Sequence, residues 1–219
     1  MNIRLSYDFN LHEFKTLLPE IQLYDENDKE DIDLLIFPGG EDVSLSYYLD
    51  EDNQKRFQNL CGTNEERDGI EKNILYEALS GNKTVNKILG VCRGVQFLNV
   101  MFGGTLFPHL DYFGIQHPGY HTITHHNKNN LDFFLTVNSL HHQGIRNTGG
   151  NYGKLGIRTY PVQIAMDNNG DVTEIISWMN DKILGIQFHP EYYASHNKDK
   201  NKFREFLYSW MAGNTTILK

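Results

Sequence analysis

The sequence has few of the residues that would mark a secreted, membrane-spanning or nucleic-acid-binding protein. Its 219 residues include only two cysteines, Cys61 and Cys92, too few for a disulfide framework. No apolar run is long enough to span a bilayer, and residues 1–7 are too short and mixed for a secretory signal. The formal net charge of −8 leaves no basic excess to follow a phosphate backbone. We therefore expect a cytoplasmic protein with reduced cysteines and with neither nucleic acid nor membrane as a partner.

What remains is the composition of an ordinary globular chain. Hydrophobic residues make up 39% and charged residues 22%, which suits one sizeable core. No repeat, low-complexity tract or linker rich in proline or serine divides the chain, so we expect a single domain over residues 1–219. The densest charge run, residues 25–31, is expected to be a solvated loop before a strand.

The order of apolar runs predicts an α/β fold with a mostly parallel sheet, helices on both faces and an antiparallel extension. In the first half, short apolar runs alternate with helical patterns, as in a parallel sheet covered by helices. Strands are expected at residues 3–7, 21–24, 34–37 and 88–91. After Gly104, runs rich in Thr, Val, Ile and Phe are separated by turn residues, and Asn169-Gly170 between two of them predicts a hairpin of residues 162–166 and 172–178.

Two helices have readable patterns. Thr63 and Glu66 have the spacing of a capping box, and Gly81 suits the end of the same helix. Its buried face is expected to carry Ile70, Ile74 and Ala78. The closing helix has five large apolar residues at the spacing of one buried face: Phe203, Phe206, Leu207, Trp210 and Met211.

Cys92 lies where a β-like run meets a helix-like run, in the sequence Ile-Leu-Gly-Val-Cys-Arg-Gly-Val-Gln. Gly90 and Gly94 flank it, which is the context of a strained strand-to-helix elbow. Such an elbow holds the thiol out of the sheet at a helix N-terminus, where the helix dipole favours thiolate over thiol. The pattern predicts that Cys92 is a catalytic nucleophile.

A histidine and a carboxylate follow another apolar run about a hundred residues later. Apolar residues alternate with Gly185, Gln187 and His189, so the histidine is expected on the opposite face of its strand, which Pro190 ends. Glu191 lies two residues beyond, where it can orient the imidazole of His189. His189 is then the predicted base and Glu191 its orienting partner.

An acyl-transfer site also needs donors for a developing oxyanion. A Pro-Gly-Gly turn follows the strand predicted at residues 34–37, and the backbone N–H groups of Gly40 and Arg93 are the predicted donors. Both would lie at the carboxyl edge of the parallel sheet, where open α/β folds place their sites.

Five motifs together resemble the class I glutamine amidotransferase superfamily. They are Pro-Gly-Gly-Glu-Asp from Pro38, Gly-Val-Cys-Arg-Gly-Val-Gln around Cys92, Gly-Gly-Thr-Leu from Gly103, Val-Asn-Ser-Leu-His-His-Gln from Val137, and Gly-Ile-Gln-Phe-His-Pro-Glu from Gly185. The fourth motif is similar to the γ-glutamyl-γ-aminobutyrate hydrolase type of peptidase C26. The resemblance implies a flavodoxin-like fold, a Cys-His-Glu triad and hydrolysis of a small γ-glutamyl amide through a thioester on Cys92. It requires neither a metal nor an organic cofactor.

The same resemblance implies which residues contact the glutamyl group: Gly39, Gln96, Ser139, Leu140, His141 and His142. A pair of polar loop histidines is the alternative for the last two. Four histidines, at positions 117, 121, 125 and 126, crowd one segment, but no carboxylate or cysteine there has ligand spacing, so no metal is expected.

The sequence departs from the family in two places. The region before Pro38 is short, which affects the amine side of the site, and Phe107-Pro108-His109 precedes a leucine where the family commonly has Gln-Asp. Two other functions stay open: a glutaminase subunit that delivers ammonia to a partner synthetase, and a binding protein without chemistry. The leaving amine and the oligomeric state, a homodimer included, also stay open.

Overall fold

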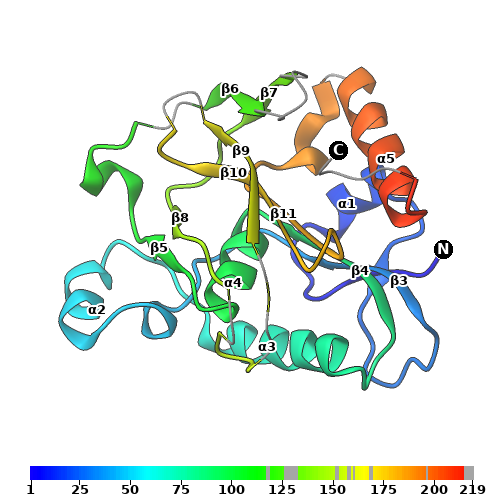
Figure 1. The fold of residues 1–219 in the computed structure, drawn as a ribbon, viewed down its shortest axis with the longest axis horizontal. Coiled ribbons are helices and arrows are strands. Elements are labelled where there is room, and N and C mark those ends of the chain that lie inside the picture. Colours follow the sequence, from blue (N-terminus) through cyan, green and yellow to red (C-terminus); the bar gives the residue numbers. More distant parts are fainter. Residues whose placement is uncertain are drawn as a thin grey trace.

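The computed structural model describes residues 1–116, 119–125, 133–150, 153–156, 159, 161–167, 170–195 and 197–214. In this part of the chain nine strands form one mixed sheet in the order β2-β1-β3-β4-β11-β10-β9-β6-β7 (Figure 1). Their bounds are β1 Ile3–Leu5, β2 Gln22–Leu23, β3 Ile32–Phe37, β4 Val85–Val91, β6 Tyr120–His125, β7 Phe133–Asn138, β9 Pro161–Asp167, β10 Thr173–Trp178 and β11 Ile183–Ile186. A separate pair consists of β5 Thr105–Phe107 and β8 Gly144–Asn147.

The sheet has a parallel half and an antiparallel half. Strands β2, β1, β3, β4 and β11 pair in parallel, whereas β10, β9, β6 and β7 extend the sheet in antiparallel fashion. Sequence patterning therefore predicted the fold class correctly. The β9–β10 hairpin is also confirmed, although Asn169 in its turn lies outside the described residues.

Helices cover both faces of the parallel half (Figure 1). They are α1 Leu11–Leu17, α3 Glu65–Ser80, α4 Arg93–Met101 and α5 Asn197–Met211. Helix α2 Glu51–Phe57 lies away from these strands, and the short 3₁₀ turns are η1 Leu45–Tyr47, η2 Leu110–Phe113 and η3 Pro190–Ser195. No helix in the described ranges is long and apolar enough to cross a bilayer.

Alternation along the buried strands produces two hydrophobic cores. Leu34 and Ile36 of β3 face one side and pack with α1 and α5, whose buried residues include Leu207 and Trp210. We call this the α1/α5 core. Leu35 of β3 faces the other side with residues of α3 and α4, which we call the α3/α4 core. Strands buried on both faces are near-continuously apolar, which explains the short apolar runs of the sequence.

Several boundaries differ from the predicted ones. Strands β1, β2 and β11 are shorter than expected, and β11 ends at Ile186 rather than at the proline. Helix α3 is capped by Asn64, whose Oδ1 accepts a hydrogen bond from Arg67 N at 3.0 Å, so the capping box of Thr63 and Glu66 is wrong. Its C-cap is Gly81 in the left-handed region, as predicted.

The buried face of α3 was also partly wrong. Ile74 and Ala78 are buried, but Ile70 is 42% exposed. Three charged residues, Arg67, Asp68 and Glu71, take its place on the buried face. The predicted stripe of α5 is confirmed, since Leu207 and Trp210 are buried and the other three residues pack against them. The charge run at residues 25–31 is a loop before β3, as expected.

Candidate active site

Cys92 lies at the junction of β4 and α4, as the sequence predicted. Its backbone has φ 52° and ψ −110°, a conformation that costs a non-glycine residue about 1–3 kcal/mol. The elbow is tight because α4 runs directly against the sheet. A Cβ on Gly94 would overlap the Phe37 carbonyl, and one on Gly90 would meet the Gly94 backbone at 2.8 Å. Glycine is therefore required at both flanking positions.

Parallel pairing brings His189 to the same sheet edge. Ile186 of β11 pairs with Val91 of β4, and Cys92 N donates to Ile186 O at 2.8 Å. The chain then carries His189 to Cys92, and a Cβ built on Gly39 would lie 3.5 Å from both Cys92 Cβ and His189 Nε2, so the two side chains lie side by side. Cys92 is 6% exposed and His189 4%, so the pair lies just beneath the surface.

Glu191 contacts the other side of the imidazole. Its Oε1 is 2.7 Å from His189 Nδ1, which leaves Nε2 to face Cys92. Burial alone would lower the pKa of His189, but the sulfur of Cys92 and the carboxylate of Glu191 outweigh burial and raise the pKa to about 10. The geometry thus favours an imidazolium beside the sulfur.

The carboxamide of Asn138, at the end of β7, fixes the backbone of His189. His189 N donates to Asn138 Oδ1 at 2.9 Å, and Asn138 Nδ2 donates to His189 O at 2.8 Å. Tyr192 lies against the imidazole, with ring centroids 4.9 Å apart, and its hydroxyl contacts Asn10. Sequence reasoning missed Asn138, although a buried polar residue at the end of an apolar run was a usable signal.

The two predicted oxyanion donors flank the nucleophile. A Cβ on Gly39 would lie 2.6 Å from His189 Cε1 and 3.5 Å from Cys92 Cβ, so this loop touches both residues. Gly40 follows with φ 126°, in the region that favours glycine. Arg93 is the first residue of α4. In the described part of the chain, the backbone N–H groups of Gly40 and Arg93 have no hydrogen-bond acceptor.

The predicted glutamyl-contacting residues are brought near the same edge but differ in exposure. Gln96 is buried, and its Nε2 donates to Gln143 O at 3.1 Å and to Gln187 Oε1 at 3.2 Å. Ser139 is buried, and its hydroxyl has no hydrogen-bond partner among the described residues. Leu140 is 59% exposed. A hydroxyl without a partner at this edge is suited to bind a polar ligand group.

The two adjacent histidines point in different directions. His141 is turned inward, with Nδ1 2.7 Å from Gln143 O and Nε2 3.9 Å from Glu174. His142 is partly exposed, and its Nε2 lies 3.0 Å from Asp42 Oδ1. The hydrogen bond to Asp42 raises the pKa of His142. His142 thereby ties this segment to the loop that carries Gly40.

The histidine-rich segment contains no described metal site. The side chain of His121 is 8% exposed, and its Nε2 lies 3.2 Å from Glu174 Oε1. His117, His126 and the side chain of His125 lie outside the described residues. Among the residues that the structure does describe, no group of three or more histidine, cysteine or acidic side chains has an arrangement that could hold a metal ion.

The second cysteine has a different environment. The Cys61 thiol donates to Pro108 O at 3.4 Å and accepts from Gln143 Nε2 at 3.5 Å. Burial, with a contribution from the Asp42 carboxylate, raises the pKa of Cys61 to about 11. Cys61 is therefore mostly protonated near neutral pH and a poor nucleophile.

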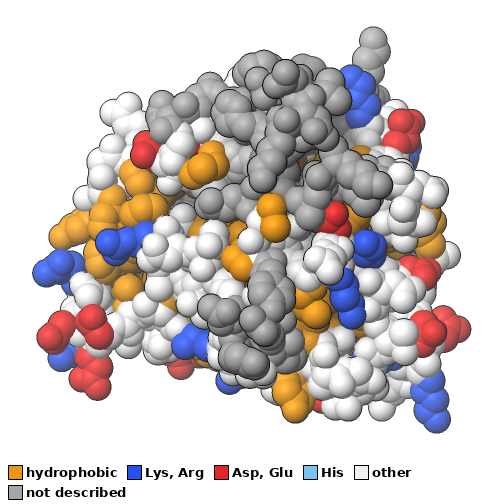
Figure 2. All heavy atoms as spheres, in the orientation of Figure 1, with side chains coloured by type: hydrophobic (Ala, Val, Ile, Leu, Met, Phe, Trp, Pro, Cys, Tyr) orange, Lys and Arg blue, Asp and Glu red, His pale blue; other side chains and the backbone are white. Residues whose placement is uncertain are grey.

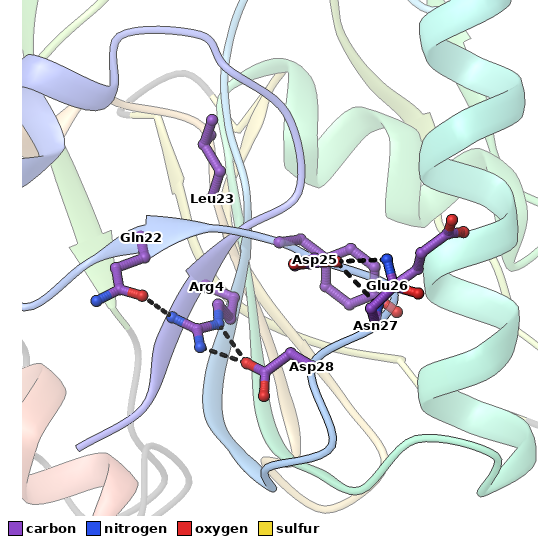
Figure 3. A pocket seen from close by; sticks show the side chains of 8 residues that line it. Arg4, Gln22, Leu23, Asp25, Glu26, Asn27 and Asp28 are labelled. Atoms are coloured by element: carbon purple, nitrogen blue, oxygen red, sulfur yellow. Dashed lines mark hydrogen bonds and ion pairs between the residues drawn. The ribbon is translucent and has the colours of Figure 1, made fainter.

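Two surface features lie apart from Cys92. A pocket at the sheet edge is lined by β1, β2 and the acidic loop, and Arg4 within it pairs with Asp28 and donates to Gln22 Oε1 at 2.6 Å (Figure 3). Hydrophobic side chains gather over α2 and η2 at the left of Figure 2, where Tyr112 and Phe113 are exposed and pack on Phe57.

The fold and the comparisons that follow place the chain in the class I glutamine amidotransferase superfamily. Residues 22–191 match the Peptidase C26 family. The chain is 35% identical over 189 residues to the glutamine amidotransferase-like protein YvdE of Lactococcus lactis subsp. lactis, covering 80% of this chain and 73% of YvdE. The chain belongs to the Peptidase C26 family, a family of cysteine-dependent enzymes that act on C–N bonds.

Solved structures agree on the fold. A Thermoplasma acidophilum protein assigned to GMP synthase superposes with a TM-score of 0.62 at 18% identity, over 97% of this chain and 94% of that one. A glutamine amidotransferase of Thermotoga maritima superposes with a TM-score of 0.54 at 13% identity, over 99% and 93%. At such identities the likeness establishes the shared fold alone.

Proposed function

We propose that the protein hydrolyses the γ-glutamyl amide bond of a small molecule in the cytoplasm, releasing glutamate and an amine. The observation that carries this proposal is the arrangement of Cys92, His189 and Glu191. A cysteine on a strained elbow lies beside an imidazole whose other nitrogen is bonded to a buried carboxylate at 2.7 Å. This is the arrangement that activates a cysteine for attack on a carbonyl.

In the first half of the reaction, the Cys92 thiolate attacks the δ-carbonyl carbon of the γ-glutamyl group. The carbonyl electron pair moves to oxygen, and the N–H groups of Gly40 and Arg93, which have no acceptor in the described residues, would bind that oxyanion. His189 then donates its Nε2 proton to the leaving nitrogen, and the C–N bond breaks. The products are a free amine and a glutamyl thioester on Cys92.

In the second half, His189 is neutral and takes a proton from water. The hydroxide equivalent attacks the thioester carbon through a second oxyanion, and the C–S bond breaks. The protonated histidine and the thiolate are restored, and glutamate leaves. Glu191 keeps the imidazole in the required orientation through both halves, because its Oε1 binds Nδ1 throughout.

The second candidate is a glutaminase subunit that passes ammonia to a partner synthetase. The identity of 35% to a protein named glutamine amidotransferase-like favours it. The chemistry at Cys92 is the same, but the amine product is ammonia and the protein should depend on a partner for activity. The Val-Asn-Ser-Leu-His-His-Gln motif favours the hydrolase.

A screen of γ-glutamyl amides with free glutamate as the readout tests the proposal. The purified protein alone is expected to turn over at least one amide other than glutamine. Cys92→Ala should abolish turnover with the fold intact, Glu191→Gln should lower it without abolishing it, and the matched variant Cys61→Ala should retain it. Activity on glutamine alone would support the glutaminase, and full activity in Cys92→Ala would refute both functions.

A further inference from the structure

One turn of helix α3 contacts both backbone segments that carry the predicted oxyanion donors. The turn consists of Arg67, Asp68 and Glu71, and all three are fully buried. Arg67 reaches the loop that contains Gly40, and the two carboxylates reach the side chain of Arg93. Charged groups are almost never fully buried unless they are paired, so this cluster needs a specific explanation.

Arg67 fixes the direction of the Gly40 amide. Its Nη2 donates to Pro38 O at 3.1 Å and to Gly39 O at 2.8 Å. A peptide group is planar and trans, so the Gly39 carbonyl and the Gly40 N–H point in opposite directions. Because the carbonyl points at the guanidinium, the Gly40 N–H points away from Arg67.

The guanidinium is itself held in place. Its Nη1 donates to Glu41 Oε2 at 2.8 Å, and its Cζ lies over the rings of Tyr7 and Phe9, at 4.7 and 5.5 Å from their centroids. A Cβ on Gly40 would overlap Nη1, so the loop approaches as closely as glycine allows. A lysine side chain has a single nitrogen and no planar fork, so it cannot bond Glu41 through one nitrogen and the two carbonyls through another.

The other donor is anchored from the same turn. Arg93 provides the second N–H at the start of α4, and its guanidinium forms ion pairs with Asp68 and Glu71. The carboxylates are positioned by further bonds: Ser44 N donates to Asp68 Oδ2 at 2.9 Å and Ser6 Oγ donates to Glu71 Oε1 at 2.6 Å. The side chain of Arg93 thus fixes its own backbone amide relative to α3.

We propose that Arg67, Asp68 and Glu71 are positioning residues that set the two oxyanion donors as one unit. The inference rests on the proposed roles of Gly40 and Arg93 and deepens them. The proposal predicts that the cluster affects one kind of reaction at Cys92 and not another. Steps that pass through an oxyanion need the cluster, whereas displacement at a saturated carbon does not, because no oxyanion forms there.

The test compares two reactions of Cys92 in one protein preparation. Acylation by p-nitrophenyl acetate, followed as nitrophenolate release above a Cys92→Ala background, passes through a tetrahedral oxyanion. Alkylation by iodoacetamide, followed by mass spectrometry of the Cys92 peptide, does not. We expect Arg67→Lys to lower the acylation rate by about 10- to 100-fold with the alkylation rate within about twofold of the wild type. Arg56→Lys, the same substitution at an exposed position, should change neither rate.

The near-isosteric variant Glu71→Gln serves as a second probe in case Arg67→Lys does not fold, and the same selective loss of acylation is expected. An unchanged acylation rate, or an equal fall in both rates, would overturn the proposal. So would a wild-type Cys92 that is alkylated but not acylated. Neither reagent carries a γ-glutamyl group, so a wild type that hydrolyses no γ-glutamyl amide would refute the proposed function and leave this test valid.

Discussion

His189 is surrounded by groups with opposite effects on its charge. Burial disfavours the imidazolium, while the Cys92 sulfur and the Glu191 carboxylate favour it, and the two partners prevail. Because Nδ1 is bonded to Glu191, the proton on Nε2 faces the sulfur and, in the proposed reaction, the leaving nitrogen. The His189 imidazolium, whose positive charge stabilises a thiolate, is therefore also the acid that donates a proton in the first half of the proposed reaction.

This coupling can be measured by titrating His189. Cys92→Ala removes one of the two favourable partners, so we expect the pKa of His189 to fall below about 10. A pKa raised in the folded state stabilises the fold below the unfolded value near 6.5, and this stabilisation is lost as the pH rises through the folded pKa. NMR titration of the imidazole Cε1–H resonance gives the value directly, and Cys61→Ala should leave it unchanged. A pKa that does not respond to Cys92→Ala would show that the sulfur is not the partner.

Among single residues, the sequence predicted those site residues that lie close to their partner in the sequence or directly after a strand. Glu191 is two residues from His189, and Cys92 and His189 each follow a strand, so both were predicted at the carboxyl edge of the sheet. Asn138 and Arg67 were missed because their partners lie 51 and 28–29 residues away, across connections whose path no local pattern specifies. A polar residue within an apolar run indicates a buried polar position, but it does not predict which residue is its hydrogen-bond partner.

In helix α3, too, some features could be predicted from the sequence and others could not. Its existence, its end at Gly81 and the burial of Ile74 and Ala78 were predictable from 3.6-residue periodicity. The rest of its buried face was not, because periodicity assigns apolar residues to the core, whereas this helix buries two carboxylates and a guanidinium. Those charges are compensated by Arg93 and by the loop carbonyls, and both partners belong to other elements.

Helix α3 is capped at its start by Asn64 rather than by the predicted Thr63. Asn64→Ala removes the bond from Arg67 N and should lower the free energy of unfolding by about 1 kcal/mol. Thr63→Ala, the matched change one residue earlier at an exposed position, should stay within about 0.5 kcal/mol of the wild type. Urea denaturation followed by far-UV circular dichroism measures both values. A larger loss for Thr63→Ala would restore the capping box that the sequence suggested.

For the whole molecule, sequence predicted the type of sheet but not its order. Alternating apolar and helical runs favour parallel strands, and the Asn-Gly turn favours the hairpin that follows. The insertion of β11 beside β4, about ninety residues earlier in the chain, depends on long-range pairing and has no local signal. That insertion places His189 at Cys92, so the site depends on the least predictable feature of the topology.

The two cores lie on opposite faces of one sheet, and each contains one of the two tryptophans. Trp178 packs in the α3/α4 core and Trp210 in the α1/α5 core. Because β3 and β4 supply residues to both cores, loss of either core should disrupt the sheet that supports the other. The chain is therefore expected to unfold in a single transition.

The single-tryptophan variants Trp178→Phe and Trp210→Phe test this expectation, because each retains a fluorescent reporter in only one core. In urea, the fluorescence transition of each variant should coincide with the far-UV circular dichroism transition of the same protein, whatever stability the substitution costs. The comparison is made within each variant, so a difference in stability between the variants does not affect it. A fluorescence change that precedes the dichroism change in one variant would mean that its core unfolds separately. Cys92 belongs to the α1/α5 core and the helix that follows it packs in the α3/α4 core, so the elbow would then lose part of its support whichever core unfolds first.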